Sequence, residues 1–150
     1  MIWTPHATVA TVVEQDGKFL LVDEIIDGAR VLNQPAGHVE KGESILDAAV
    51  RETLEETGWH VKPTHLVGVY TYTAPNDVTY YRFCFAADAG HLDEQATLDE
   101  GIVGPVWLTE EDIRRAESQW RSPLLIRCIE DFIKGKRYPL DLIYEHAQES

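Results

Sequence analysis

The sequence predicts an α+β fold, an α/β/α sandwich in which helices cover a mixed β-sheet. Segments rich in Val, Thr and aromatic residues are mixed with a few helical patterns, without the regular βαβ alternation of all-parallel sheets. Hydrophobic residues make up 44% of the 150 residues, which is a normal globular share. No repeat, linker or low-complexity segment divides the chain. We therefore predict one domain that spans residues 1–150.

The first strands are expected as a hairpin followed by a short extended segment. Asp16-Gly17 is a strong signal for a hairpin turn, and Asp27-Gly28 marks a second turn. The Pro-Ala-Gly sequence at residues 35–37 is then expected to break regular structure and leave a loop. The three expected strands cover residues 6–14, 18–26 and 30–34.

A helix is expected between Ser44 and Gly58. Ser44 is a suitable N-cap residue, and Asp47 three positions later resembles a capping box. Gly58 suits the left-handed position that follows a helix. Apolar and threonine side chains recur at helical spacing and are expected to form the buried stripe, which comprises Leu46, Ala49, Val50, Thr53, Leu54 and Thr57.

The second half of the chain is expected to combine strands with two helices. Thr109 can cap a helix that extends to about residue 117. Pro123 is expected in the first turn of a last helix that ends at Gly135, and the partly apolar tail from Tyr138 is expected to dock. The acidic loop is expected at residues 88–101, and the strands at residues 65–73, 78–87 and 103–108.

Charge and cysteine content exclude several classes of protein. The formal net charge of −13 argues against tight binding to a nucleic-acid polymer, which needs a basic surface. No apolar run is long enough to span a membrane, and the N-terminus lacks a signal-peptide pattern, so we expect a cytoplasmic protein. Cys84 and Cys128 form no CxxC motif, and we expect them to be buried free thiols.

An acidic cluster distinguishes the expected helix. Glu52, Glu55 and Glu56 lie beside the apolar stripe and share one arc of the helix surface. Like charges at this spacing repel one another unless water screens them or a cation binds between them. Three carboxylates together with the Gly37 carbonyl would suit Mg²⁺, which takes oxygen ligands and binds phosphates. A solvated acidic face is the other interpretation of these carboxylates alone.

The complete pattern around this cluster resembles the signature of Nudix hydrolases. The residues at its fixed positions, all within residues 37–59, are Gly37, Glu43, Arg51, Glu52, Glu55, Glu56 and Gly58. Thr53 and Trp59 depart from the pattern, which has aliphatic residues at both places. The resemblance implies the Nudix fold and the hydrolysis of a phosphoric anhydride with Mg²⁺, or with Mn²⁺ as a substitute ion.

The same resemblance implies roles for single residues. Arg51 would orient a glutamate, and the general base would be Glu52 or Glu56. A loop acid, Asp99 or Glu100, could add a ligand or a base, and a solvated loop acid is the alternative. We select Glu100 as a metal ligand. The selected metal ligands are Gly37, Glu52, Glu55, Glu56 and Glu100, and the selected catalytic residues are Arg51, Glu52 and Glu56.

Cations and aromatic residues outside the motif are candidates for substrate binding. Arg82 is a cation inside an otherwise apolar strand, so it could reach substrate phosphates or pair with an acid. Lys18 is a weaker candidate of the same kind. Tyr72 could stack on a base or pack in the core, and the same holds for Trp3, Tyr70 and Tyr80. We select Arg82, Lys18 and Tyr72 as substrate-binding residues.

Three further segments, residues 33–38, 121–124 and 137–140, resemble a branch of bacterial phosphatases within this family. That resemblance implies release of orthophosphate from nucleoside tri- and diphosphates and from hydroxymethylpyrimidine pyrophosphate. We therefore expect a monomeric enzyme that acts on a small nucleotide or pyrimidine pyrophosphate. The alternatives are hydrolysis of another linked diphosphate, such as ADP-ribose or a dinucleoside polyphosphate, and a nucleotide-sensing module without catalysis.

Overall fold

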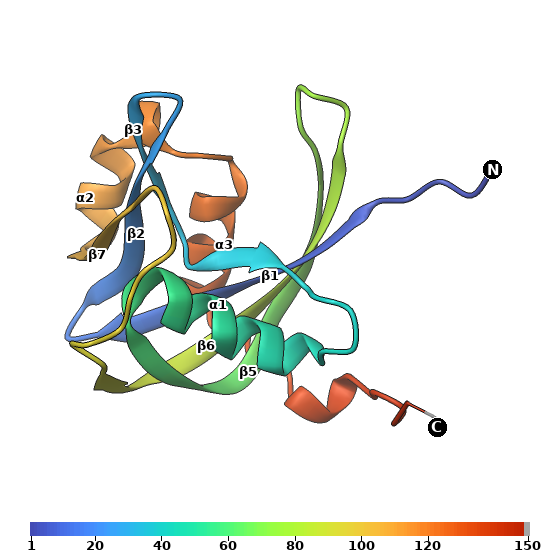
Figure 1. Ribbon diagram of the computed structural model, residues 1–150. Coiled ribbons are helices and arrows are strands. Elements are labelled where there is room, and N and C mark those ends of the chain that lie inside the picture. Colours follow the sequence, from blue (N-terminus) through green and yellow to red (C-terminus); the bar gives the residue numbers. More distant parts are fainter. Residues whose placement is uncertain (149–150) are drawn as a thin grey trace.

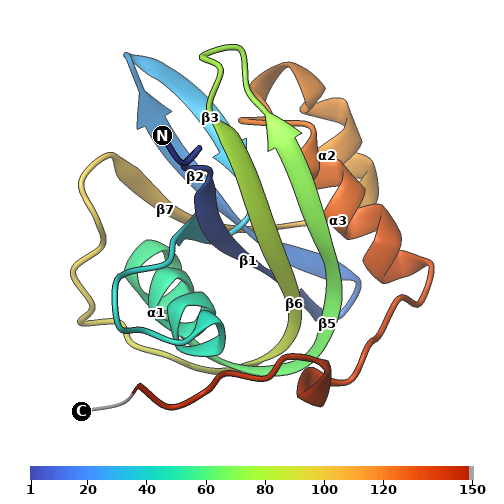
Figure 2. The ribbon, with the colours of Figure 1, turned by 90° about the vertical axis from the view of Figure 1, so that its right-hand side faces the viewer.

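The computed structural model describes residues 1–148 of the chain (Figures 1 and 2). The strands are β1 (His6–Gln15), β2 (Lys18–Ile26), β3 (Ala29–Asn33), β4 (Ala36–His38), β5 (Trp59–Thr73), β6 (Thr79–Leu92) and β7 (Ile102–Leu108). The helices are α1 (Ile45–Thr57), α2 (Glu110–Arg115) and α3 (Leu124–Ile133), and the 3-10 turns are η1 (Glu117–Gln119) and η2 (Leu140–Leu142). This mixture of strands with a few helices is the predicted α+β class.

β1 lies at the centre of a mixed sheet. The strand order is β3-β2-β1-β6-β5, and β4 also pairs with β1 while β7 pairs with β2. β1 runs parallel to β6, from His6 opposite Tyr80 to Val13 opposite Ala87. The other pairs are antiparallel. Only the last two residues of β1 pair with β2, so the β1–β2 hairpin opens beyond its turn.

Helices lie on both faces of the sheet, α1 on one side and α2 with α3 on the other (Figure 2). Successive residues of β1 point to opposite layers, as expected for a strand. Val9 belongs to a buried cluster with Ala48 and Ala49 of α1. Its neighbour Ala10 belongs to another cluster with Leu125 of α3. The predicted α/β/α sandwich is therefore confirmed.

Two expectations from composition concern the thiols and the membrane. Cys84 and Cys128 are buried and free, as predicted. Both belong to the cluster that packs against α3. Within residues 1–148, every helix is too short or too polar to cross a membrane.

β5 and β6 are longer than predicted. The prediction began the first of them at residue 65 and ended the second at residue 87, whereas β5 begins at Trp59 and β6 ends at Leu92. The additional pairing joins Trp59 to Leu92 and contains a register shift beside Pro63. Polar residues and Pro63 hide this segment in the sequence, but β5 is an edge strand and tolerates a proline. The acidic loop therefore begins only after Leu92.

The loop predicted at residues 35–37 is wrong in part, because β4 pairs with β1 there. Pro35 has no N–H to donate, yet its carbonyl accepts the Thr11 N–H at 3.1 Å. The next residue, Ala36, donates its N–H to the Glu56 carboxylate at 2.8 Å. β4 is thus held by pairing with β1 and by the hydrogen bond from Ala36 to Glu56 of α1, and these contacts keep Gly37 against α1.

The later helices begin close to the predicted positions. Thr109 caps α2 and forms a full capping box with Asp112. α2 ends at Arg115 instead of near residue 117, because the chain tightens into η1. Pro123 lies at the cap position of α3, one place before the expected first turn. The tail docks as expected, since Leu140 and Ile143 pack against the cluster that contains α1.

Candidate metal centre

α1 carries the acidic cluster, and both of its ends lie where the sequence predicts them. Ser44 Oγ accepts the Asp47 N–H at 3.0 Å. Gly58 adopts the left-handed conformation with a φ of 79°, and its N–H donates to the Leu54 carbonyl at 2.9 Å. These caps determine where α1 begins and ends, and hence the directions of its side chains.

The buried face of α1 differs from the predicted stripe. Val50 and Leu54 are only partly buried, whereas Glu56 is buried. Thr53 also lies on the buried face, and its Oγ1 is 2.9 Å from Thr11 Oγ1 of β1. Thr53, which replaces an aliphatic residue of the family pattern, therefore supplies a buried hydrogen bond between helix and sheet. Small side chains on this face bring Glu56 close to the sheet as well.

Three carboxylates from two segments meet beside α1. One oxygen from each of Glu52, Glu55 and Asp99 lies within 4.8 Å of the other two. The Asp99 N–H donates to the Glu55 carbonyl at 3.1 Å, which ties the acidic loop to the helix. Glu100 is exposed and is not part of this group among the described residues. The structure thus brings Asp99, and not the selected Glu100, to the two glutamates.

The two neighbouring loop acids form a matched pair for mutation. Asp99→Asn is expected to weaken Mn²⁺ binding about 30-fold, because it removes one anionic oxygen, whereas Glu100→Gln should change it less than about twofold. Titration calorimetry on the purified variants measures both values. The reverse order of effects would restore Glu100 as the ligand.

Arg51 holds the acidic cluster together. Its Nε and Nη2 donate to the Glu43 carboxylate at 2.7 and 2.9 Å. Its Nη1 donates to Glu52 and to Glu55, each at 3.0 Å. Nη2 also donates to the His38 carbonyl at 3.0 Å. The hydrogen bond from Arg51 lowers the pKa of Glu43 below its usual value. These contacts place Arg51 between Glu43, Glu52 and Glu55, and its orienting role stays a prediction.

Gly37 lies in β4 directly against Glu52. A Cβ at this position would lie 2.2–2.4 Å from the three carboxyl atoms of Glu52. Glycine is therefore required for the close approach of β4 to this carboxylate. Gly37 also lines a cavity next to the cluster, so it joins the two parts of the site.

Gly37→Ala is expected to displace the Glu52 carboxylate and to weaken Mn²⁺ binding about tenfold. The change in the free energy of unfolding should be small, because Gly37 is not among the residues with a positive φ. Calorimetric titration and thermal melts measure the two effects separately. Wild-type metal affinity in this variant would show that Glu52 does not need this space.

Glu56 is the most buried carboxyl of the group. Its side chain is 7% exposed and accepts the Ala36 N–H at 2.8 Å. Burial raises the pKa of Glu56 to about 8; the Ala36 hydrogen bond opposes this rise, and repulsion from Glu52 and Glu24 adds to it. Burial also raises the pKa of Glu52. Glu56 stands outside the three-oxygen group of the described residues, so it forms a separate feature of the site.

Two residues near Glu56 were not selected from the sequence. Glu24 of β2 is buried, and Arg121 Nη1 donates to its Oε1 at 3.1 Å. Glu24 raises the pKa of Glu56, and Arg121 lowers it. The sequence did hold a signal for Glu24, because it is a charged residue inside a largely apolar strand. The same signal led to the selection of Arg82.

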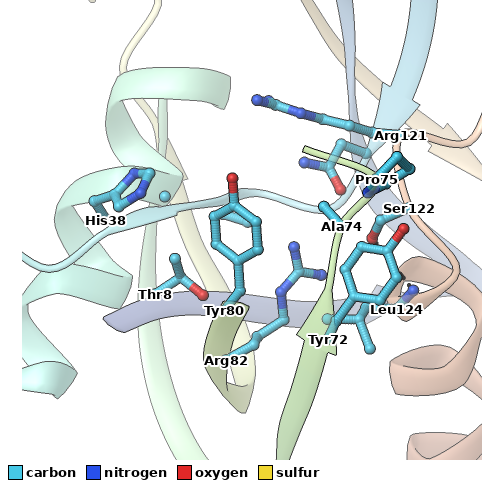
Figure 3. A pocket seen from close by; sticks show the side chains of 13 residues that line it. Thr8, His38, Tyr72, Ala74, Pro75, Tyr80, Arg82, Arg121, Ser122 and Leu124 are labelled. Atoms are coloured by element: carbon cyan, nitrogen blue, oxygen red, sulfur yellow. Dashed lines mark hydrogen bonds between the residues drawn. The ribbon is translucent and has the colours of Figure 1, made fainter. Parts of the chain in front are cut away.

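A cavity of about 220 Å³ adjoins the acidic cluster (Figure 3). Gly37 and His38 of β4 line the cavity, and His38 lies on the side nearest α1 in Figure 3. Tyr72 of β5 and Tyr80 of β6 also line the cavity, and the Arg82 guanidinium lies between them in Figure 3. The structure thus brings two of the selected substrate-binding residues, Arg82 and Tyr72, to one place.

Lys18, the third selected residue, lies elsewhere. It is exposed and pairs with Gln15 at the turn end of β1. The cavity contacts β1 at Thr8, close to the opposite end of that strand. The sequence ranked Lys18 below Arg82 but could not exclude it, because Lys18 is a cation at the start of an apolar run.

Comparisons with known proteins agree with the motif. The family model described as the NUDIX domain matches residues 4–128. Phosphatase NudJ of Escherichia coli strain K12 is 40% identical over 142 residues, which cover 95% of this chain and 92% of that protein. A solved NUDIX hydrolase from Nitrosomonas europaea is 47% identical with a TM-score of 0.95, covering 97% of this chain and 100% of that one. The MutT protein from Methanosarcina mazei Go1 shares the fold, with 22% identity, a TM-score of 0.69, and coverage of 91% and 100%.

Proposed function

The chain belongs to the Nudix hydrolase family, and we propose that it is a Mg²⁺-dependent phosphohydrolase that releases orthophosphate. Its proposed substrates are nucleoside tri- and diphosphates and hydroxymethylpyrimidine pyrophosphate. The observation that carries the proposal is the meeting of Glu52, Glu55 and Asp99 beside a cavity lined by Arg82. The 40% identity to a protein named as a phosphatase supports orthophosphate as the product.

A divalent cation fits the donor set of the acidic cluster. Carboxylate oxygens are the hard donors that Mg²⁺ and Mn²⁺ prefer, and three of them lie within 4.8 Å of one another. Glu52, Glu55 and Asp99 would hold the ion, and the family motif adds Glu56 and the Gly37 carbonyl as candidates. When bound, the ion supplies positive charge that neutralises the phosphate oxygens and polarises the phosphoryl group.

The protein's own groups supply orientation and proton transfer. Arg51 holds Glu52 and Glu55 through its two Nη1 hydrogen bonds of 3.0 Å. A general base works best when its pKa lies near the working pH. Of the two candidate bases, Glu56 is the more buried, and burial raises its pKa to about 8 in the metal-free protein. We therefore assign to Glu56 the removal of a proton from the attacking water.

The proposed substrate is a small molecule. A cavity of about 220 Å³ suits part of a small phosphorylated molecule rather than a polymer. The formal net charge of −13 also opposes a nucleic-acid polymer. We further propose that the protein acts as a monomer in the cytoplasm.

Product analysis over a panel of substrates tests this function. Orthophosphate and pyrophosphate are quantified with nucleoside tri- and diphosphates, hydroxymethylpyrimidine pyrophosphate, ADP-ribose and a diadenosine polyphosphate. We expect orthophosphate from the first three in the presence of Mg²⁺ and no product with a chelator. Pyrophosphate as the product, or turnover confined to the last two compounds, would contradict the phosphatase assignment. Binding without turnover would indicate a nucleotide-sensing module.

A further inference from the structure

Arg82 is a buried cation that has no carboxylate partner within residues 1–148. It is 9% exposed, its Nη1 donates to Gln34 Oε1 at 2.8 Å, and it lies beside the Cys128 thiol. Its Nε has no hydrogen-bond partner among the described residues. The ion pairs that these residues form do not include Arg82. Burial of a guanidinium without an opposite charge is unfavourable unless a ligand supplies one.

The cavity that Arg82 faces is cationic in an otherwise acidic protein. Of the described residues that line it, none is an aspartate or a glutamate, although the chain has a formal net charge of −13. Arg121 extends over the rim, and its side chain is 50% exposed. Its contact with Glu24 is a single hydrogen bond, in which Nη1 donates to Oε1 at 3.1 Å. The local charge therefore favours an anion.

α3 begins at the same cavity. Ser122 and Leu124 line the cavity, and the ten residues of α3 start at Leu124. The cap residue, Pro123, makes no side-chain cap hydrogen bond, and the first turn contains no acidic residue. The Leu124 N–H is held by Ser122 Oγ at 3.2 Å. The N-terminus of a helix carries partial positive charge, which adds to the charge of Arg82.

We propose that this cavity is an anion subsite that holds the phosphate of the substrate that is not attacked. Gly37 lines the cavity and also lies against Glu52, so the subsite and the metal centre share one wall. A substrate with two adjacent phosphates would place one at the acidic cluster and the other at Arg82. The role in the reaction rests on the proposed function, whereas binding of a free phosphate at Arg82 does not.

Binding of inorganic phosphate to metal-free protein tests the subsite without turnover. Millimolar phosphate in the presence of a chelator is expected to raise the melting temperature of the wild type by several degrees, compared with chloride at equal ionic strength. Arg82→Gln should abolish this rise. Lys18→Gln is the charge-matched control, because it removes one positive charge from an exposed position outside the cavity. This control should keep the full rise.

Two further measurements separate the subsite from a purely structural role of Arg82. In phosphate-free buffer, Arg82→Gln should melt no lower than the wild type, because it removes an unpaired buried charge. Arg82→Lys keeps the positive charge but loses the paired N–H donors of the guanidinium, which bind two phosphate oxygens at once. The phosphate affinity measured by ³¹P NMR titration should therefore fall about tenfold. If Arg82→Gln does not fold, the Arg82→Lys titration alone tests the subsite, and an unchanged phosphate affinity in that variant overturns it.

The outcomes are distinct from those of the substrate panel. An equal phosphate-induced rise in the wild type and Arg82→Gln, or no rise in the wild type, overturns the subsite. An Arg82-dependent rise with acetate or with a nucleoside that lacks phosphate, but not with phosphate, also overturns it. A protein that binds phosphate through Arg82 and hydrolyses nothing would keep the subsite and lose the proposed function.

Discussion

Replacement of Glu55 by glutamine is expected to reduce Mg²⁺-dependent release of phosphate about 1,000-fold and to leave the fold intact. Glu55 supplies one of the three oxygens that lie within 4.8 Å of one another. Glutamine keeps the shape of the side chain but loses the negative charge that attracts the ion. Glu56→Gln should cause a comparable loss, because it removes the proposed base. Rates at saturating Mg²⁺, together with thermal melts, measure activity and folding separately.

An exposed glutamate supplies the control for both substitutions. Glu14 lies near the end of β1, is exposed and is not part of the acidic cluster, so Glu14→Gln removes the same charge outside that cluster. This variant should retain the wild-type rate. Unchanged turnover in both the Glu55 and the Glu56 variants would refute the metal-site assignment. A loss of activity that comes with a large fall in melting temperature would instead indicate a structural role.

A second large effect is expected in the stability of the metal-free protein. Between about pH 5 and about pH 9, the wild type should lose about 4 kcal/mol of unfolding free energy that Glu56→Gln does not lose. Burial raises the pKa of Glu56 from 4.5 to about 8. Between these values the folded state keeps a proton that the unfolded state has released. The stabilisation is therefore complete below pH 4.5 and is lost as the pH rises through about 8.

Urea unfolding in the presence of a chelator measures this dependence at each pH. Glu52 contributes in the same direction, because burial raises its pKa as well, so a smaller slope remains in Glu56→Gln. Saturating Mg²⁺ should flatten the slope of the wild type, since a bound cation favours the charged carboxylate. Identical slopes in the wild type and Glu56→Gln would show that Glu56 is not the buried acid responsible.

Local features of the site were predictable from the sequence because nearby residues determine them. The N-cap of α1 at Ser44 and its left-handed end at Gly58 depend on contacts within a few positions. Arg51 and Glu55 meet for the same reason, since residues four positions apart are neighbours on a helix. The resemblance to the Nudix signature rests on this local segment and correctly indicated the fold.

Features that depend on contacts between distant segments were not predictable in the same way. The choice between Asp99 and Glu100 depends on a backbone hydrogen bond to Glu55, which no local pattern reveals. The burial of Glu56 depends on how closely α1 approaches the sheet. The convergence of Arg82 with the first turn of α3 depends on packing across the cavity. Charged residues inside apolar strands were the useful signal, but they could not show which cation faces the site.

The parallel pairing of β1 with β6 makes the site depend on a late step of folding. β1 and β2 are adjacent in the chain but pair only beside their turn, whereas His6 must find Tyr80 beyond α1 and β5. Closure of such a long loop costs chain entropy before the new contacts compensate for it. Gly37 is held on β1 and Arg82 on β6, so the cavity exists only after this closure. A nascent chain that has formed only α1 therefore carries the acidic motif but lacks the cavity lined by Arg82.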